Sequence, residues 1–178
     1  MKINLFETHI YVDNIDCSKI NLENQNFKKS WDSETPSSHL FKNKLEEKSQ
    51  VYLTNKIGSL LESQILKNFK ITIAGIWQND YIENDFQETH MHPHSHFSFI
   101  IYKKIEESKT VFYHPIQDLI SCMYPSEFFS KTNFFRSNFE TKCRENQMVL
   151  FPSYLAHMVK KDSNSTTISG NVLIEIQI

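Results

Sequence analysis

The residues with the clearest potential for chemistry are histidines, and they gather in two short segments. Five of the eight histidines of the chain lie there. His90, His92, His94 and His96 belong to QETHMHPHSHFSFIIY, and His157 belongs to FPSYLAHMV. Imidazole nitrogen is a common ligand of transition metals, and three protein ligands leave coordination positions open for a substrate. These histidines therefore predict a single metal site of the catalytic type.

The spacing of the five histidines indicates which three of them could bind one metal ion. Residues i and i+2 of a strand point to the same face, so His90 and His92 can reach one ion together. Pro93 favours a strand end because it lacks a backbone donor, which leaves His94 outside the pair. His157, on a distant strand, would be the third ligand. Two other interpretations stay open. The alternating run also fits an exposed strand edge that binds Zn or Ni adventitiously, and a lone histidine such as His157 is often an ordinary core residue.

The elements that must position these histidines are mainly strands. From Ile71 onward, short segments of large apolar residues are separated by turn signals, which is typical of a sandwich or barrel. The segments read ITIAGIW, FSFIIY, TVFYH, MVLFP and NVLIEIQI, and the opening LFETHIYV reads as a further strand. We expect a single domain, residues 1–178, in which residues 71–178 form a double-stranded β-helix, or jelly roll, that carries the metal site.

The N-terminal part, residues 1–70, is expected to add a strand and helices. Between residues 40 and 69 the apolar side chains recur at helical spacing, and Ser37 or Ser38 is a candidate N-cap. The residues on that helix face are Ile57, Leu60, Leu61 and Ile65. We expect these helices to pack on the outside of the barrel.

A long stretch from His114 to Glu140 interrupts the series of predicted short strands. It holds five phenylalanines among polar residues. A connection of that length is usually functional or mobile. We interpret it as a cover over the site or, equally, as a packed insertion, and expect substrate contacts between Tyr124 and Phe139.

Composition limits the classes of partner. The chain has 178 residues, 39% of them hydrophobic and 22% charged, with a net charge of −2. Scattered basic residues argue against nucleic acid or an anionic membrane as the main partner, and no apolar run has transmembrane or secretory length. The three cysteines (Cys17, Cys122 and Cys143) form no paired motif, which predicts a reduced, cytoplasmic setting.

Residues 71–171 resemble a family of 2-oxoglutarate/Fe(II)-dependent oxygenases of bacteria and marine phages. The corresponding parts are Trp77-Gln78-Asn79, the HxHP segment from His90 to Pro93, Ser98 through Tyr102, the FPSYLAH block ending at His157, and Thr167-Ile168-Ser169 with Asn171. The resemblance implies a jelly-roll barrel that binds Fe(II) and 2-oxoglutarate. It implies His90 and His157 as the two histidine ligands. His92 stands where such oxygenases more often have Asp or Glu, and Glu88 is an alternative carboxylate ligand.

The chain departs from that pattern at the co-substrate anchor. The family carries a basic residue on the last strand, which pairs with the far carboxylate of 2-oxoglutarate. Here that position holds Thr167, or Ser165 with a different gap, and no Arg follows His157. Lys104 is the preferred substitute, with Tyr102 adding a hydroxyl, and the other nearby lysines are Lys103, Lys160 and Lys161. The resemblance also makes Thr167, Ser169, Asn171 and Asn79 candidates for binding the co-substrate.

Two alternative functions therefore remain open. The Pro152-to-His157 spacing also fits a cupin-type metal protein, which needs no 2-oxoglutarate. The chain could also be a non-catalytic binding module. If it is an oxygenase, we expect a small-molecule or peptide substrate, and we predict a possible homodimer.

Overall fold

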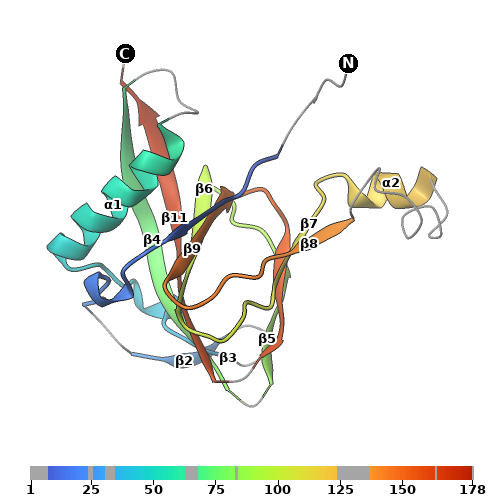
Figure 1. Cartoon of the computed structure of the whole chain (residues 1–178), viewed down its shortest axis with the longest axis horizontal. Helices are drawn as coiled ribbons and strands as arrows, with labels where there is room; N and C mark the ends of the chain where they lie inside the picture. Colours follow the sequence, from blue (N-terminus) through green and yellow to red (C-terminus); the bar gives the residue numbers. More distant parts are fainter. Residues whose placement is uncertain are drawn as a thin grey trace.

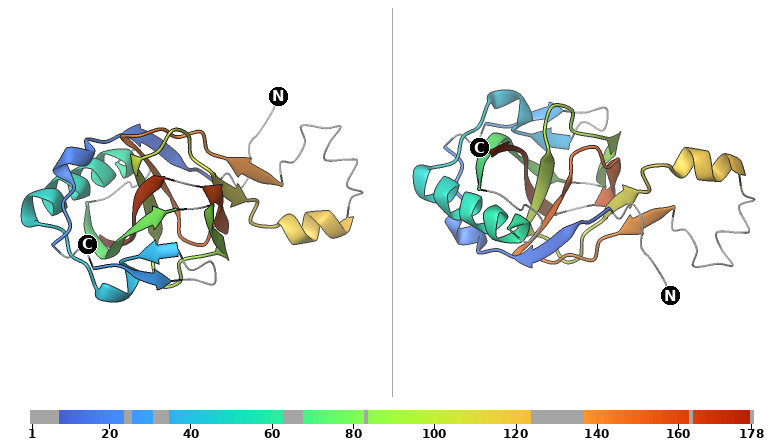
Figure 2. Two further views of the ribbon diagram at one scale, coloured as in Figure 1. Left: turned by 90° about the horizontal axis from the view of Figure 1, so that it is seen from below. Right: turned by 90° about the horizontal axis from the view of Figure 1, so that it is seen from above.

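The computed structural model describes residues 8–23, 26–30, 35–62, 68–82, 84–123, 137–162 and 164–177. Its strands form two antiparallel sheets that face each other across a common interior (Figures 1 and 2). The larger sheet has the order β1-β9-β6-β11-β4-β3-β2, and the smaller has the order β5-β10-β7-β8. This is the expected mainly β, double-stranded β-helix architecture.

The larger sheet is built around two long strands. β4 (Phe69–Tyr81) pairs with β11 (Ser165–Ile176), and β11 also pairs with β6 (Phe97–Lys104). The other strands of this sheet are β9 (Gln147–Pro152), β1 (Tyr11–Asn14), β3 (Thr35–Ser37) and β2 (Lys28–Ser30). Four segments of the predicted strands lie within β4, β6, β9 and β11. The opening strand is shorter than expected within the described part of the chain, because β1 begins only at Tyr11.

The smaller sheet carries the other predicted strand. It contains β5 (Asp85–His90), β10 (His157–Asp162), β7 (Thr110–Tyr113) and β8 (Asn138–Glu140). β10 pairs with both β5 and β7, so it lies at the centre of this sheet. The two predicted histidine segments therefore reach neighbouring strands.

The outer face of the larger sheet is covered by helix α1 (Glu47–Leu61), as Figures 1 and 2 show. Leu53, Ile57 and Leu61 are fully buried in the cluster that joins the helix to the sheet. Each such side chain contributes about 1.5–3 kcal/mol of transfer free energy. The helix was expected on this outer side, but it begins at Glu47 and not after Ser37 or Ser38. Ser37 ends β3, and Ser38 precedes a 3-10 turn, η2 (His39–Phe41).

The remaining elements are short. A 3-10 turn, η1 (Cys17–Lys19), follows β1, and α2 (Gln117–Met123) projects away from the two sheets (Figure 1). Residues 124–136 of the stretch that we interpreted as a cover, His114 to Glu140, lie outside the described residues. Within the described part of the chain, no helix has the length and apolar character needed to cross a bilayer.

Candidate metal centre

His90, His92 and His157 meet at one end of the interior. β5 ends at His90, β10 begins at His157, and the two residues are register partners across these antiparallel strands. His92 lies beyond the end of β5, where its backbone N–H donates to the carbonyl of Ser153 at 3.0 Å. The shared strand face inferred for His90 and His92 is therefore only partly correct, because the chain leaves the sheet before His92. His92 still reaches the same point from the turn.

Backbone contacts fix two of the three rings. Nδ1 of His90 lies 2.8 Å from the carbonyl oxygen of Glu88, and Nδ1 of His157 lies 3.0 Å from that of Leu155. A carbonyl oxygen only accepts hydrogen bonds, so each Nδ1 carries the proton. In each of these two rings Nε2 therefore carries the lone pair that can bind a metal ion.

The distances fit metal coordination. One ligand atom from each histidine lies within 4.8 Å of the others, and the Nε2 atoms of His92 and His157 are 3.3 Å apart. Two nitrogens bound to one ion at about 2.1 Å are about 3.0–3.4 Å apart. Among the described residues, Glu88 is not a member of this cluster. The donor set is thus three neutral imidazoles, which suit Fe, Zn, Cu or Ni and leave coordination positions open.

Aromatic side chains hold the cluster in an apolar environment. Phe151 and Phe112 lie against the His157 ring, with centroid distances of 4.7 and 5.5 Å. Trp77 stacks on His92 at 5.7 Å, and the edge of His39 meets Trp77 at 4.9 Å. His39 was not singled out from the sequence, because it is a lone histidine far from both histidine segments. Its place beside Trp77 depends on how η2 packs on β4.

Burial keeps the three histidines neutral. Burial, with smaller contributions from the neighbouring His90 and His39, lowers the pKa of His92 to about 4. Burial also lowers the pKa of His90 and that of His157, the latter well below its ordinary value. Neutral imidazole is the form that binds metal, so protons compete weakly with a metal ion at pH 7.

These shifts predict a pH-dependent stability of the metal-free protein. In the folded state His92 has a pKa of about 4, below the value of 6.5 expected after unfolding, so the unfolded state binds the proton more tightly between these values. The contribution of His92 to the free energy of unfolding is therefore fully present above pH 6.5. It is lost as the pH drops towards 4, which lowers the free energy of unfolding by about 3 kcal/mol. Urea unfolding at pH 7 and pH 4.5 measures this loss. His92→Gln should reduce it, and an equal loss in that variant would contradict the assignment.

A small cavity extends from the cluster into the barrel. Its lining includes His90, His92 and His157 at one end, and Tyr102, Thr110 and Lys109 further in. Thr167 and Ser169, two of the candidates for binding the co-substrate, also line it. The hydroxyl Oγ1 of Thr167 is buried and has no hydrogen-bond partner. A polar interior with an unpaired hydroxyl fits a polar ligand better than an apolar one.

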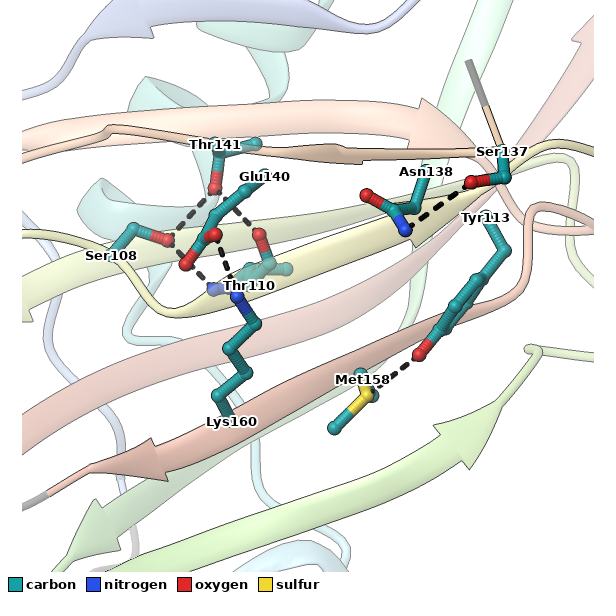
Figure 3. A network of polar contacts seen from close by, with 9 residues as sticks. All are labelled: Ser108, Thr110, Tyr113, Ser137, Asn138, Glu140, Thr141, Met158 and Lys160. Carbon is teal, nitrogen blue, oxygen red and sulfur yellow. Dashed lines mark hydrogen bonds and ion pairs between the residues drawn. The ribbon is translucent and has the colours of Figure 1, made fainter. Parts of the chain in front are cut away.

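Tyr102 is held by a network of hydroxyl groups. It is buried, and its hydroxyl donates to Oγ1 of Thr110 at 3.0 Å and accepts from Oγ of Ser108 at 3.0 Å. Oγ of Ser108 lies 2.8 Å from Oγ1 of Thr141, as Figure 3 shows. Burial raises the pKa of Tyr102 to about 12, so the phenol keeps its proton at neutral pH. The hydroxyl is therefore a fixed polar group at the inner end of the cavity.

The other predicted co-substrate residues lie elsewhere. Lys104, at the end of β6, is exposed and is not among the described residues that line the cavity. Lys103, Lys160 and Lys161 are exposed too, and Lys160 pairs with Glu140 at 2.7 Å (Figure 3). Asn79 is buried outside the lining, with an unpaired Oδ1. Asn171 accepts a hydrogen bond from Ser98 at 3.0 Å.

A larger groove lies on the other side of Trp77. It has a volume of about 760 Å³, and its lining includes Trp77, Gly75, Asn171 and His39. Lys42 and Lys44 contribute positive charge to the lining, and Glu23 and Glu47 contribute negative charge. Its size lies in the range of small-ligand sites. Trp77 therefore lines both this groove and the cavity at the cluster.

The comparisons with known proteins agree with this geometry. Residues 75–169, more than half of the chain, match the family model described as "Putative 2OG-Fe(II) oxygenase". No curated protein sequence matches the chain.

Three solved structures show the same fold. HygX from Streptomyces hygroscopicus, with nickel, 2-oxoglutarate and hygromycin B bound, gives a TM-score of 0.54 at 9% identity, over 93% of this chain and 82% of that one. SnoN, a non-heme alpha ketoglutarate dependent epimerase from nogalamycin biosynthesis, gives a TM-score of 0.53 at 8% identity, over 88% of this chain and 71% of that one. A 2OG-Fe(II) oxygenase family oxidoreductase from Burkholderia pseudomallei gives a TM-score of 0.50 at 13% identity, over 92% of this chain and 68% of that one. Together with the match over residues 75–169, these findings identify the chain as a member of the 2OG-Fe(II) oxygenase family.

Proposed function

We propose that this protein oxidises a small-molecule or peptide substrate at a mononuclear Fe(II) centre held by His90, His92 and His157. The observation that carries the proposal is the convergence of three imidazole nitrogens within 4.8 Å at one end of the barrel. Membership of the family supplies the co-substrate, 2-oxoglutarate. When bound, Fe(II) and 2-oxoglutarate would supply O₂-dependent oxidation, in which one oxygen atom of O₂ goes to a substrate C–H bond and the other to the succinate that forms, with CO₂, from 2-oxoglutarate.

The residues of the chain would then have separable roles. The three histidines hold the metal, and Phe151, Phe112 and Trp77 exclude water from it. The hydroxyls of Tyr102, Thr167 and Ser169 line the space in which 2-oxoglutarate would extend into the barrel. Asn171 and the buried Asn79 are proposed to support this site through hydrogen bonds.

The substrate is proposed to enter from the groove beside Trp77. That groove borders the metal centre and carries two lysines and two glutamates, so its formal charge is balanced. A balanced, polar groove favours a neutral or zwitterionic substrate over a polyanion such as nucleic acid. HygX, which has the same fold, was solved with a small molecule, hygromycin B, bound. A homodimer and a cytoplasmic location stay predictions from the sequence.

Formation of succinate tests the function without knowledge of the substrate. Many oxygenases turn over 2-oxoglutarate slowly when no substrate is present, so the purified protein with Fe(II), O₂ and 2-oxoglutarate should release succinate, which NMR measures. Omission of Fe(II) is the control. Stoichiometric metal binding without succinate would favour the alternative, a cupin-like metal protein or a binding module. The absence of an Arg after His157 is the observation on which that alternative rests.

A further inference from the structure

We propose that Lys109 provides the positive charge that binds the carboxylate of 2-oxoglutarate furthest from the metal, together with the hydroxyl of Thr167. The inference rests on the proposed function and goes beyond it, because it assigns the missing anchor to a residue just before β7 and not to the last strand. A carboxylate in a buried cavity needs a cation or several hydrogen-bond donors, since burial of an unpaired charge is costly.

Lys109 lies at the cavity that the three histidines line. It lines the space that begins at the three histidines, and it is half-buried. Of the described residues in that lining, Lys109 alone is a lysine or arginine. Lys104, in contrast, is exposed at the end of β6 and does not line the space.

The distance of Lys109 from the metal ligands also fits the length of 2-oxoglutarate. His157 is the register partner of Phe112, and Val159 is the partner of Thr110, so Thr110 lies one two-residue step further in than the metal ligand. Such a step is about 7 Å along a strand. Lys109 directly precedes Thr110, and its four-carbon stem can bring the ammonium group back towards a ligand that starts at the metal. A five-carbon diacid spans a comparable distance.

One hydroxyl completes the anchor. Thr167 is one of the two residues that match the position of the family's basic residue, and its buried Oγ1 has no hydrogen-bond partner. Thr167 is the register partner of Tyr102 on β6, whose own hydroxyl proton is donated to Thr110. Hydrogen bonds to a charged acceptor are about twice as strong as neutral ones, and this gives the unpaired hydroxyl a favourable partner.

The backbone around Lys109 is fixed on both sides. The backbone N–H of Thr110 donates to Oγ of Ser108 at 3.1 Å, within the network drawn in Figure 3. The carbonyl of Lys109 accepts from the N–H of Lys160 at 3.0 Å. Lys109 also lines a groove of about 620 Å³ together with Glu106 and Arg144, so it lies between that groove and the cavity. The cavity at the histidines holds only about 10 Å³ and must widen for a ligand.

Calorimetry on the full-length protein loaded with Ni(II) tests the inference, because this ion binds imidazole and supports no turnover. The ligands are 2-oxoglutarate and 2-oxopentanoate, which has the same metal-binding end and no distal carboxylate. The unaltered protein should prefer 2-oxoglutarate. Lys109→Met should weaken 2-oxoglutarate binding about 10- to 100-fold and leave 2-oxopentanoate binding unchanged. Lys104→Met is the matched control and should bind both ligands like the unaltered protein.

The outcomes separate the inference from the function on which it rests. If Lys109→Met keeps the full preference for 2-oxoglutarate, Lys109 is not the anchor, although the proposed function stands. If Lys104→Met loses the preference, the anchor is Lys104 and the inference is wrong. If the unaltered protein binds Ni(II) and no 2-oxoglutarate, the proposed function fails and the inference fails with it.

Discussion

Replacement of His157 by alanine is expected to abolish metal binding at the cluster and lower the affinity for Fe(II) by at least about 100-fold. His157 is 2% exposed, and its ring meets both His90 and His92, with centroid distances of 4.3 and 5.1 Å. Its Nδ1 proton is held by Leu155, so the loss removes an oriented ligand. Two ligands then remain, and succinate formation should fall to the level without iron. Equilibrium dialysis with Fe(II) under anaerobic conditions measures the affinity.

The matched control for this variant is His94→Asn. His94 belongs to the same histidine run but is exposed and lies outside the cluster. Its φ of 64° is a left-handed value that asparagine tolerates, so the variant should fold without strain. It should bind metal like the unaltered protein. Equal losses in both variants would show that the histidine run binds metal adventitiously.

Replacement of Gly170 by alanine is expected to lower the free energy of unfolding by about 3 kcal/mol. Gly170 lies in β11, opposite Phe99 of β6 and Ile76 of β4. A Cβ there would lie 2.6 Å from the carbonyl oxygen of Gly75 and would collide with the ring of Phe99, which is 1% exposed. Neither neighbour has space to move. For a protein of this size the expected fall in Tm is about 6–12 °C.

Gly58→Ala provides the contrasting variant. Gly58 lies in α1, and a Cβ there would lie 3.6 Å from Cδ1 of Ile71, an ordinary contact. Alanine favours a helix by up to about 1 kcal/mol over glycine, so this variant should be more stable than the unaltered protein. Thermal unfolding of both metal-free variants gives the comparison. A Gly170→Ala protein as stable as Gly58→Ala would contradict the packing of β11 against β6 and β4.

The histidine pattern allowed His90, His92 and His157 to be grouped without coordinates, and the structure brings them together. The end of the strand was misplaced, because β5 ends at His90 and not after His92 as Pro93 suggested. The register that places His157 opposite His90 could not be predicted, because it depends on pairing between strands far apart in the chain. The approach of His39 to Trp77 depends in the same way on tertiary packing.

Lys104, the anchor preferred from the sequence, does not line the cavity, and the reason is local. Lys104 follows the metal motif along a strand, but that strand ends there and Lys104 faces solvent. Whether Lys104 or Lys109 reaches the interior is decided by the turn between β6 and β7, which spacing alone does not specify. The start of α1 was misplaced because Ser37, a residue type that often serves as an N-cap, is the last residue of β3.

The central claim is that His90, His92 and His157 hold Fe(II) in a form that binds 2-oxoglutarate. Anaerobic addition of 2-oxoglutarate to the Fe(II)-loaded protein, followed by visible absorption spectroscopy, tests it most directly. We expect a weak metal-to-ligand charge-transfer band in the unaltered protein and in His94→Asn, and no band in His157→Ala. Stoichiometric Fe(II) bound through the histidines with no band on addition of 2-oxoglutarate would contradict the claim.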